Sequence, residues 1–246
     1  MQRFKILLPV LFSLISAAIS AQTKTTSPFR KIIVSPYIQV TLVQGDKESV
    51  TVNELHVDSS KLHIEVNDKT LRIYLEGAKD LPKNEKDYSN GYKETHPLYH
   101  KTSVVATITY RRLETLSFRG EEDQLCKSSI NADRLMLKIY GETNVTFNEM
   151  NVKQLTATLY GEGSLEVKAG EIRDQKYTSY GESKVNTLAV NSSTGRVTAY
   201  GRADFKLNID DWIKITSFGE AQVHYKGDPT IEKWLHFGDV VVNKID

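Results

Sequence analysis

The sequence has 246 residues, of which 39% are hydrophobic and 26% are charged. Its 32 Lys and Arg residues are balanced by 31 Asp and Glu residues. These proportions are those of an ordinary globular chain, and the balanced charge gives no overall preference for nucleic acid or anionic lipid. The basic residues are spread along the chain, which argues against a nucleic-acid-binding surface. Cys126 is the only cysteine, so a disulfide within the chain is excluded.

The N-terminal segment, up to Ala21, has the pattern of a secretory signal peptide. Arg3 and Lys5 precede an apolar run over residues 6–19, and small residues ending in Ala21 follow it. A basic start, a short apolar stretch and small residues at its end predict cleavage after Ala21. The apolar run is too short for a comfortable membrane span, and the mature chain holds no longer one. We expect an exported protein whose mature chain has no membrane span and begins with a flexible polar leader at residues 22–28.

Residues 29–110 are predicted to form an irregular β region that leads into a more regular one. Short alternating or β-branched stretches, which are typical of strands, recur through residues 29–75 and again at 103–110. Between them, residues 77–101 form a long polar segment rich in Asn, Lys, Glu and Tyr. A connection of this length is either a functional loop or a disordered one.

The C-terminal part contains a repeat in which an aromatic residue followed by Gly recurs at nearly constant spacing. The aromatic members are Tyr140, Tyr160, Tyr180, Tyr200, Phe218 and Phe237. A degenerate earlier member, Phe118-Arg119-Gly120, precedes them. Gly suits a sharp corner because it reaches positive φ without a Cβ clash, and a constant register predicts coils stacked about 4.8 Å apart. We therefore expect an all-β fold, a β-solenoid with coils of about 20 residues, over residues 118–246.

Alternation before each aromatic residue sorts the side chains by face. Two columns are predicted to face the interior: Leu137, Ala157, Tyr177, Val197 and Ile215, and Ile139, Leu159, Ser179, Ala199 and Ser217. The column between them faces outward: Lys138, Thr158, Thr178, Thr198 and Thr216. The aromatic column shares that outward face, where stacking at strand spacing supports either a structural or a binding role. Polar bends are expected to close the coils at Asn131, Asn151, Glu171, Asn191 and Asp211.

An acidic residue follows most of the corner glycines. These residues are Glu142, Glu162, Glu182, Glu220 and Asp239. Stacked coils would bring them into a ladder of like charges, which is unfavourable. Carboxylates in such a ladder suit Ca²⁺, but one carboxylate per coil supplies few ligands, and Arg202 between Glu182 and Glu220 would relieve the repulsion. We therefore expect a solvated surface ladder without a metal or another cofactor.

Several landmarks resemble the head GIN domain family of putative auto-transporter adhesins, which are exported bacterial β-solenoid proteins. They are FRKIIV at residues 29–34, IQVTL at 38–42, QGD at 44–46 and DKTLRI at 68–73, followed by the glycine corners. Their order is fairly specific and covers residues 29–246. The resemblance implies a single β-solenoid domain over that range, in the periplasm or on the outer surface of a Gram-negative bacterium. It implies no established activity. The polar segment 77–101 departs from the family pattern, and Arg202 departs from the acidic residues at the chain's own corners.

Two classes of function fit this sequence. The first is a non-enzymatic envelope or surface protein, adhesin-like or scaffolding, that binds an unknown protein or glycan through the aromatic strip. The alternative is a carbohydrate-active β-helix enzyme, a polysaccharide lyase or hydrolase, which would need carboxylates converging in a cleft. The sequence contains no nucleophile elbow and no phosphate-binding loop, so no catalytic residue is assigned. Open strand edges at the ends of the solenoid also allow self-association.

Overall fold

The part of the chain described by a computed structural model comprises residues 22–82, 84–89 and 92–245. The predicted signal peptide, residues 1–21, lies outside it. No helix in the described part is long and apolar enough to cross a membrane.

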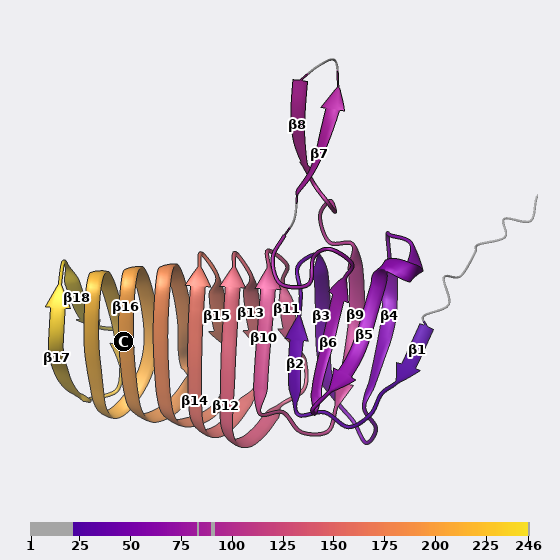
Figure 1. Cartoon of the computed structure of the whole chain (residues 1–246). Helices are drawn as coiled ribbons and strands as arrows, with labels where there is room; N and C mark the ends of the chain where they lie inside the picture. Colours follow the sequence, from indigo (N-terminus) through magenta and orange to yellow (C-terminus); the bar gives the residue numbers. More distant parts are fainter. Residues whose placement is uncertain (1–21, 83, 90–91, 246) are drawn as a thin grey trace, which may run out of the picture.

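The C-terminal half winds into stacked coils with a front and a back layer (Figure 1). The front layer contains β10 (Thr115–Gly120), β12 (Ile130–Gly141), β14 (Met150–Gly161) and β17 (Thr230–Phe237). The back layer contains β11 (Gln124–Cys126), β13 (Asn144–Phe147), β15 (Ser164–Val167) and β18 (Val240–Lys244). Strand β16 (Gly170–Lys226) runs through the coils between them without interruption. All these coils pair in parallel, which confirms the predicted β-solenoid.

The corner glycines hold the register of the stack. Tyr160-Gly161 pairs with Tyr140-Gly141 on one side and with Tyr180-Gly181 on the other. Gly161 has φ +110° and Gly181 has φ +113°, a region that residues with a Cβ rarely adopt. A Cβ on Gly181 would lie 2.7 Å from the carbonyl oxygen of Gly161 in the neighbouring coil. The corners therefore need glycine both for the turn and for close stacking.

The interior columns lie where the alternation predicts. Leu137, Ala157, Val197 and Ile139 are all fully buried, and the outward Thr residues between these columns are partly exposed. The interior is not uniformly apolar, however. In β16 the buried Gln175 accepts hydrogen bonds from the hydroxyls of Tyr177 and Thr187 and donates one to Ser192. This network satisfies polar groups that would otherwise be costly to bury.

Two details of the repeat differ from the sequence-based expectation. Asn131 and Asn151, expected in bends, are paired residues near the starts of β12 and β14, and Nδ2 of Asn151 donates to Oδ1 of Asn131. The strand pairing simply continues through these positions. In the degenerate corner, Phe118 is buried and Arg119 occupies the aromatic column opposite Tyr140. The reason is that this corner aligns through its glycine, Gly120 with Gly141, so the residue directly before Gly120 takes the outward position and Phe118 the inward one.

The N-terminal region continues the same parallel ladder in a different chain order. Strands β2 (Lys31–Val34) and β3 (Ile38–Gln44) form the coil that stacks on β10 and β11. Strands β6 (Thr70–Leu75) and β9 (Val104–Tyr110) form the next coil outward. Antiparallel strands flank that coil: β5 (Leu62–Asn67) pairs with β6, and β4 (Ser49–Leu55) pairs with β9. A short 3₁₀ helix (Ser59–Lys61) connects these two flanking strands.

Two further segments complete the region. Part of the segment expected as a leader, β1 (Gln22–Thr25), pairs antiparallel with β4. The polar segment 77–101 leaves the coil between β6 and β9, at a position equivalent to a corner. It contains the antiparallel hairpin of β7 (Asn84–Ser89) and β8 (Tyr92–Pro97), which projects above the solenoid (Figure 1).

Candidate functional site

The six aromatic side chains predicted as a strip form a continuous stack on the outside of the front layer. Here they are called the aromatic ladder. Ring centroids from Tyr140 to Tyr200 are 4.8–4.9 Å apart, with interplanar angles of 3–4°. Phe218 and then Phe237 extend the stack at 5.0 and 5.8 Å. The middle rings, from Tyr160 to Phe218, are 37–40% exposed. The parallel register and the nearly constant repeat length together bring the rings into line.

This stacking determines which part of each ring can meet a ligand. Both faces of Tyr160, Tyr180 and Tyr200 are covered by the neighbouring rings. The guanidinium of Arg119 lies 5.2 Å from the ring centroid of Tyr140 and covers that end of the ladder. Asp80 fixes Arg119 through an ion pair of 2.6 Å. The ladder therefore presents ring edges and Tyr hydroxyls. Within the described residues, Phe237 is the one ladder ring with a face that neither a ring nor a guanidinium covers, and it is 64% exposed.

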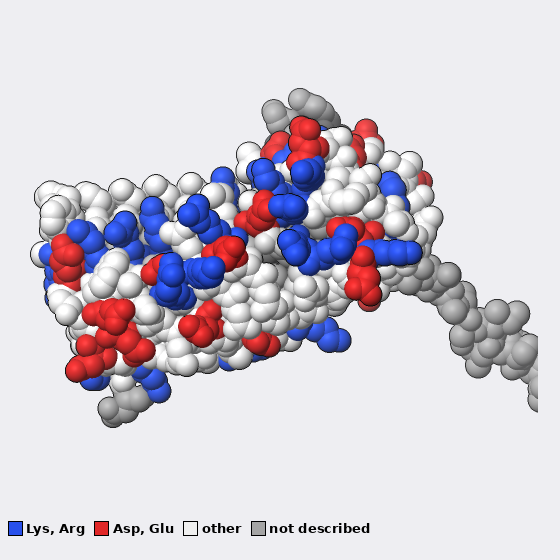
Figure 2. Space-filling view, turned by 90° about the horizontal axis from the view of Figure 1, so that it is seen from below, with Lys and Arg blue, Asp and Glu red and all other residues white. Residues whose placement is uncertain are grey.

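Two parallel columns accompany the ladder on the same face. The nearer one is the outward Thr column, from Lys138 to Thr216. The second lies four residues before each aromatic residue from Tyr140 to Phe218, and it begins with Met136 and Thr156. It continues as Lys176, Arg196 and Lys214. Basic side chains form a row along the solenoid when it is seen from below (Figure 2). This basic column was not predicted from the sequence, although its spacing from the aromatic residues between Tyr140 and Phe218 is constant.

Tryptophans pack beside the basic column. The Nζ atom of Lys214 lies 3.7 Å from the ring centroid of Trp234, and the guanidinium of Arg196 lies 5.8 Å from that of Trp212. Both distances are within the range of cation–π attraction. Trp234 is 65% exposed because β17 bulges at this point, between the partners of Ile215 and Thr216. Neither tryptophan follows the repeat, so no periodic signal pointed to them.

Exposed apolar surface is concentrated on this side of the molecule. Within the described residues, ten large apolar side chains are exposed, and eight of them belong to the front layer. The eight are Met136, Tyr160, Tyr180, Tyr200, Phe218, Trp234, Leu235 and Phe237. Soluble monomers rarely gather exposed apolar side chains into one contiguous area. We use the term front face for the basic column, the Thr column and the aromatic ladder together.

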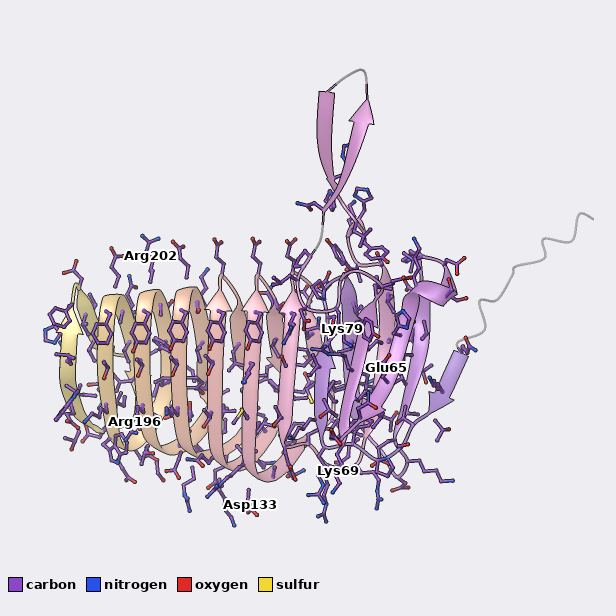
Figure 3. All side chains as sticks on the ribbon, in the orientation of Figure 1. Glu65, Lys69, Lys79, Asp133, Arg196 and Arg202 are labelled. Carbon is purple, nitrogen blue, oxygen red and sulfur yellow. The ribbon has the colours of Figure 1, made fainter. Side chains whose placement is uncertain are left out.

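The acidic column borders the front face at the corner of the coils. Figure 3 shows Arg202 at this corner and Arg196 towards the opposite edge of the same face. Arg202 forms ion pairs of 3.2 Å with Glu182 and 3.0 Å with Glu220. These hydrogen bonds and charges raise the pKa of Arg202. The arginine thus separates the carboxylates of its neighbouring coils, so the column needs no cation at this point.

A shallow polar groove follows the edge of the first coils, below the front face. Its carboxylates form salt bridges with basic side chains: Glu114 with Arg30, Asp133 with Lys153 and Asp174 with Arg173. Carboxylates paired in this way do not form the free acid and base that polysaccharide cleavage requires. In the described part of the chain, no group of three or more His, Cys, Asp or Glu residues could hold a metal ion. The geometry gives the enzyme alternative no support.

The single thiol is also unsuited to chemistry. Cys126 is buried at the junction of the N-terminal region and the repeats, because β11 pairs with both β3 and β13. Burial raises its pKa to about 12, so the reactive thiolate is scarce at neutral pH. Its sulfur lies 3.9 Å from the hydroxyl of Tyr110, within the core. The residue is therefore a packing residue.

Comparison with known proteins assigns the family. The family model for the putative auto-transporter adhesin, head GIN domain, matches residues 28–229. The chain is a member of the head GIN domain family. The match covers the N-terminal region and most of the repeats, and it confirms the resemblance seen in the sequence. No curated protein matches the chain.

Solved structures share the fold of this head GIN domain. A putative adhesin from Bacteroides fragilis has 18% identity and a TM-score of 0.74, over 92% of this chain and 96% of its own. A putative adhesin from Parabacteroides merdae has 18% identity and a TM-score of 0.65 over the same shares. A protein from Parabacteroides distasonis described as a putative lipid binding protein has 17% identity and a TM-score of 0.62, over 92% and 97%. At these identities the likeness concerns the fold alone.

Proposed function

We propose that this head GIN domain is a non-enzymatic, exported module of the cell envelope or cell surface that binds a partner through its front face. One observation carries the proposal: eight of the ten exposed large apolar side chains in the described residues lie in the front layer. The remaining outer surface of the coils is covered mainly by polar and charged residues, as a solvated surface is. An adhesin-like or scaffolding role needs such a face on a rigid support.

The fold supplies that support. Each coil pairs with its neighbours along both layers, so the front face cannot bend independently of the core. Ladder stacking fixes the rings before any partner arrives, which lowers the entropic cost of binding. Because the rings show their edges, the face suits a broad flat partner better than a single sugar ring lying on an aromatic face.

A paired set of surface variants tests the proposal. In the first, Tyr160→Ala is combined with Tyr180→Ala on the front face. In the control, Glu166→Ala is combined with Asn186→Ala at outward positions of the back layer. Both proteins are checked for equal circular dichroism and thermal unfolding. They are then used to capture partners from envelope extracts and on glycan arrays. Loss of capture with the front-face variant alone is expected, and equal capture by both variants would contradict the proposal.

Location is tested separately by fractionating the cells that produce the full chain. We expect the protein in the periplasmic or outer-membrane fraction, with a mature N-terminus at residue 22. Recovery of the uncleaved chain in the cytoplasm would contradict export.

A further inference from the structure

We propose that the groove below the front face, together with the basic column, binds a linear acidic polysaccharide that runs along the solenoid axis. The site is formed by five exposed basic side chains, which are called the basic track here: Lys31, Arg112, Arg134, Lys176 and Arg196. Within the described residues, none of the five forms an ion pair. The inference goes beyond the proposed function, because the aromatic ladder takes no part in this site.

The groove carries more positive than negative charge. Five basic and three acidic side chains line it. Each of the three carboxylates is paired with one of the basic side chains, which leaves Arg112 and Arg134 without a carboxylate partner in the described part of the chain. The charges of the whole chain are balanced, so this excess is local. A cleft lined by one sign of charge attracts ligands of the opposite sign.

The strand register extends the row of cations beyond the groove. Thr115 and Thr156 line the groove and lie in one column of the stacked coils. The same column continues to Lys31 on one side and to Lys176 on the other. Arg196 follows one repeat after Lys176. From Lys31 to Arg196 the track is about 24 Å long at the spacing of paired strands, and Figure 2 shows basic side chains in a row along the solenoid.

The contacts of the last cations define where the track ends. Arg196 packs against Trp212 at 5.8 Å, a contact that fixes the guanidinium without neutralising it. Lys214, in the next coil, is instead paired with Glu232 at 3.0 Å. The charge of Lys214 is therefore already matched within the chain, whereas the charges of Arg196 and Lys176 are open to a ligand.

Neutral polar groups beside the track suit the hydroxyls of a sugar. The hydroxyls of Thr115 and Thr156 and the side-chain amide of Gln154 line the groove. Within the described residues, these three groups have no hydrogen-bond partner in the chain. Hydroxyls and amides can both donate and accept, as a polyhydroxylated ligand requires. The groove volume of about 1360 Å³ exceeds the roughly 300–1,000 Å³ of small-molecule sites, so an extended chain fits it better.

Other polyanions match these features less well. Single-stranded nucleic acid gains affinity by stacking its bases on free aromatic faces. Near the track, Arg196 lies over the ring of Trp212, and neighbouring rings cover both faces of Tyr180. An anionic membrane is flat and would rest on the rim of the groove without filling it. A linear acidic polysaccharide supplies acid groups to the cations and hydroxyls to the neutral groups at the same time.

Polymers that differ only in charge test the inference. The purified protein is titrated with polygalacturonate and with dextran sulfate, and binding is measured by isothermal titration calorimetry. Methyl-esterified polygalacturonate and unmodified dextran are the uncharged controls. We expect both charged polymers to bind, less tightly as salt is added because salt screens the contacts, and the uncharged ones not to bind. Failure of both charged polymers at low salt, or equal binding of the uncharged ones, overturns the proposal.

Matched charge variants locate the site. Lys176→Gln combined with Arg196→Gln should weaken binding about tenfold or more. Lys184→Gln combined with Lys206→Gln removes the same charge from the same two coils, but from exposed positions of the back layer, and should leave binding unchanged. Lys176→Arg combined with Arg196→Lys keeps the charge and should retain binding. Equal losses in the two Gln variants would show attraction to the whole chain and would overturn the site.

A variant of the aromatic ladder separates this inference from the proposed function. Tyr160→Ala combined with Tyr180→Ala should leave binding of the acidic polymers unchanged, because the rings lie outside the track. If these substitutions abolish binding, the polymers lie on the ladder, so the basic track fails while the proposed function stands. Tighter binding of polyglutamate, or of vesicles containing phosphatidylglycerol, than of either acidic polysaccharide would identify a different class of partner and also overturn the inference.

Discussion

The N-terminal region and the repeats form one continuous parallel ladder, but the order in which their strands follow each other along the chain differs. In the repeats, each strand pairs with the equivalent strand of the next coil along the chain, as Tyr140 does with Tyr160. In the N-terminal region, neighbours are distant in sequence: β2 lies between β6 and β10, and Thr115 pairs with Lys31. Their interiors differ as well, because β16 buries the Gln175 network whereas β2 and β6 bury aliphatic side chains.

The difference shows that the same architecture can be held together in two ways. Local pairing lets each coil form on the one before it, and it tolerates polar residues where they satisfy each other. Non-local pairing has to close long loops first, so it depends more on apolar burial. We expect the N-terminal region to set the stability of the whole chain, and the far end of the repeats to open on its own.

The largest effect is expected from a core truncation in the N-terminal region. Leu71→Ala, at a fully buried position of β6, should lower the free energy of unfolding by about 3–5 kcal/mol, since it leaves a cavity between packed strands. Hydrogen exchange should then rise in both regions. The matched variant Leu207→Ala, also fully buried, should raise exchange mainly in the last coils. Leu71→Ala leaving the repeats fully protected would show that the repeats are stable without the N-terminal region.

The second largest loss of stability is expected from replacing a corner glycine. Gly181→Ala should cost about 2–3 kcal/mol, because Ala at φ +113° is strained and its Cβ would press on the carbonyl of Gly161. The control is Gly195→Ala within the same strand. Its φ lies outside the positive region, and its nearest obstacle is the Cδ1 atom of Ile209 at 3.2 Å. Urea unfolding of both variants measures the difference, and equal costs would mean that the corner geometry does not hold the stack.

Replacing a buried glutamine at the junction of the two regions should lower the free energy of unfolding somewhat less. The buried side chain of Gln124 accepts from the backbone N–H of Val40 at 2.8 Å and donates to the carbonyl of Ile38 at 3.0 Å. Gln124→Leu leaves both backbone groups unpaired and should cost about 2 kcal/mol. Gln175→Leu should cost less, because the hydroxyls of its network can bond to one another. Chemical denaturation compares the two, and a larger cost for Gln175→Leu would contradict the contrast between the regions.

The smallest signal concerns Cys126, which reports whether the junction opens. Its pKa of about 12, against an ordinary 9.0, lowers the thiolate fraction roughly a thousandfold at pH 8. Iodoacetamide should therefore label the folded protein far more slowly than the unfolded chain. A raised thiol pKa favours the folded state below about pH 9, and this contribution is lost as the pH rises towards 12. Rapid labelling at pH 8 without global unfolding would show that the two regions separate at β11.

The sequence predicted the repeats well because their geometry is periodic. Alternation identified the interior columns, and the corner spacing identified the aromatic ladder. The degenerate corner was misassigned, since one extra residue between its aromatic ring and its glycine exchanges the inward and outward faces of Phe118 and Arg119. A shift of one residue always has this effect in a strand.

The order of the strands in the N-terminal region, and the basic and tryptophan residues beside the aromatic ladder, could not be predicted from the sequence. A parallel pair between strands as distant in sequence as those of Lys31 and Thr115 leaves no periodic trace. Trp234 is exposed on the front face because of a bulge in β17, and no sequence pattern predicts that bulge. Arg196 and Lys214 follow the repeat, but as charged residues in outward positions they resemble any solvated face.

The position of β2 and β3 has a consequence for how the chain assembles as it is exported. These two strands pair outward with β6 and β9, so they can complete a coil as soon as residue 110 is available. Their other edges are then unpaired and ready to accept β10 and β11 in parallel. Each following coil can stack on the preceding one in the order in which it leaves the export machinery. The N-terminal region would therefore act as a template that sets the handedness and register of every later coil.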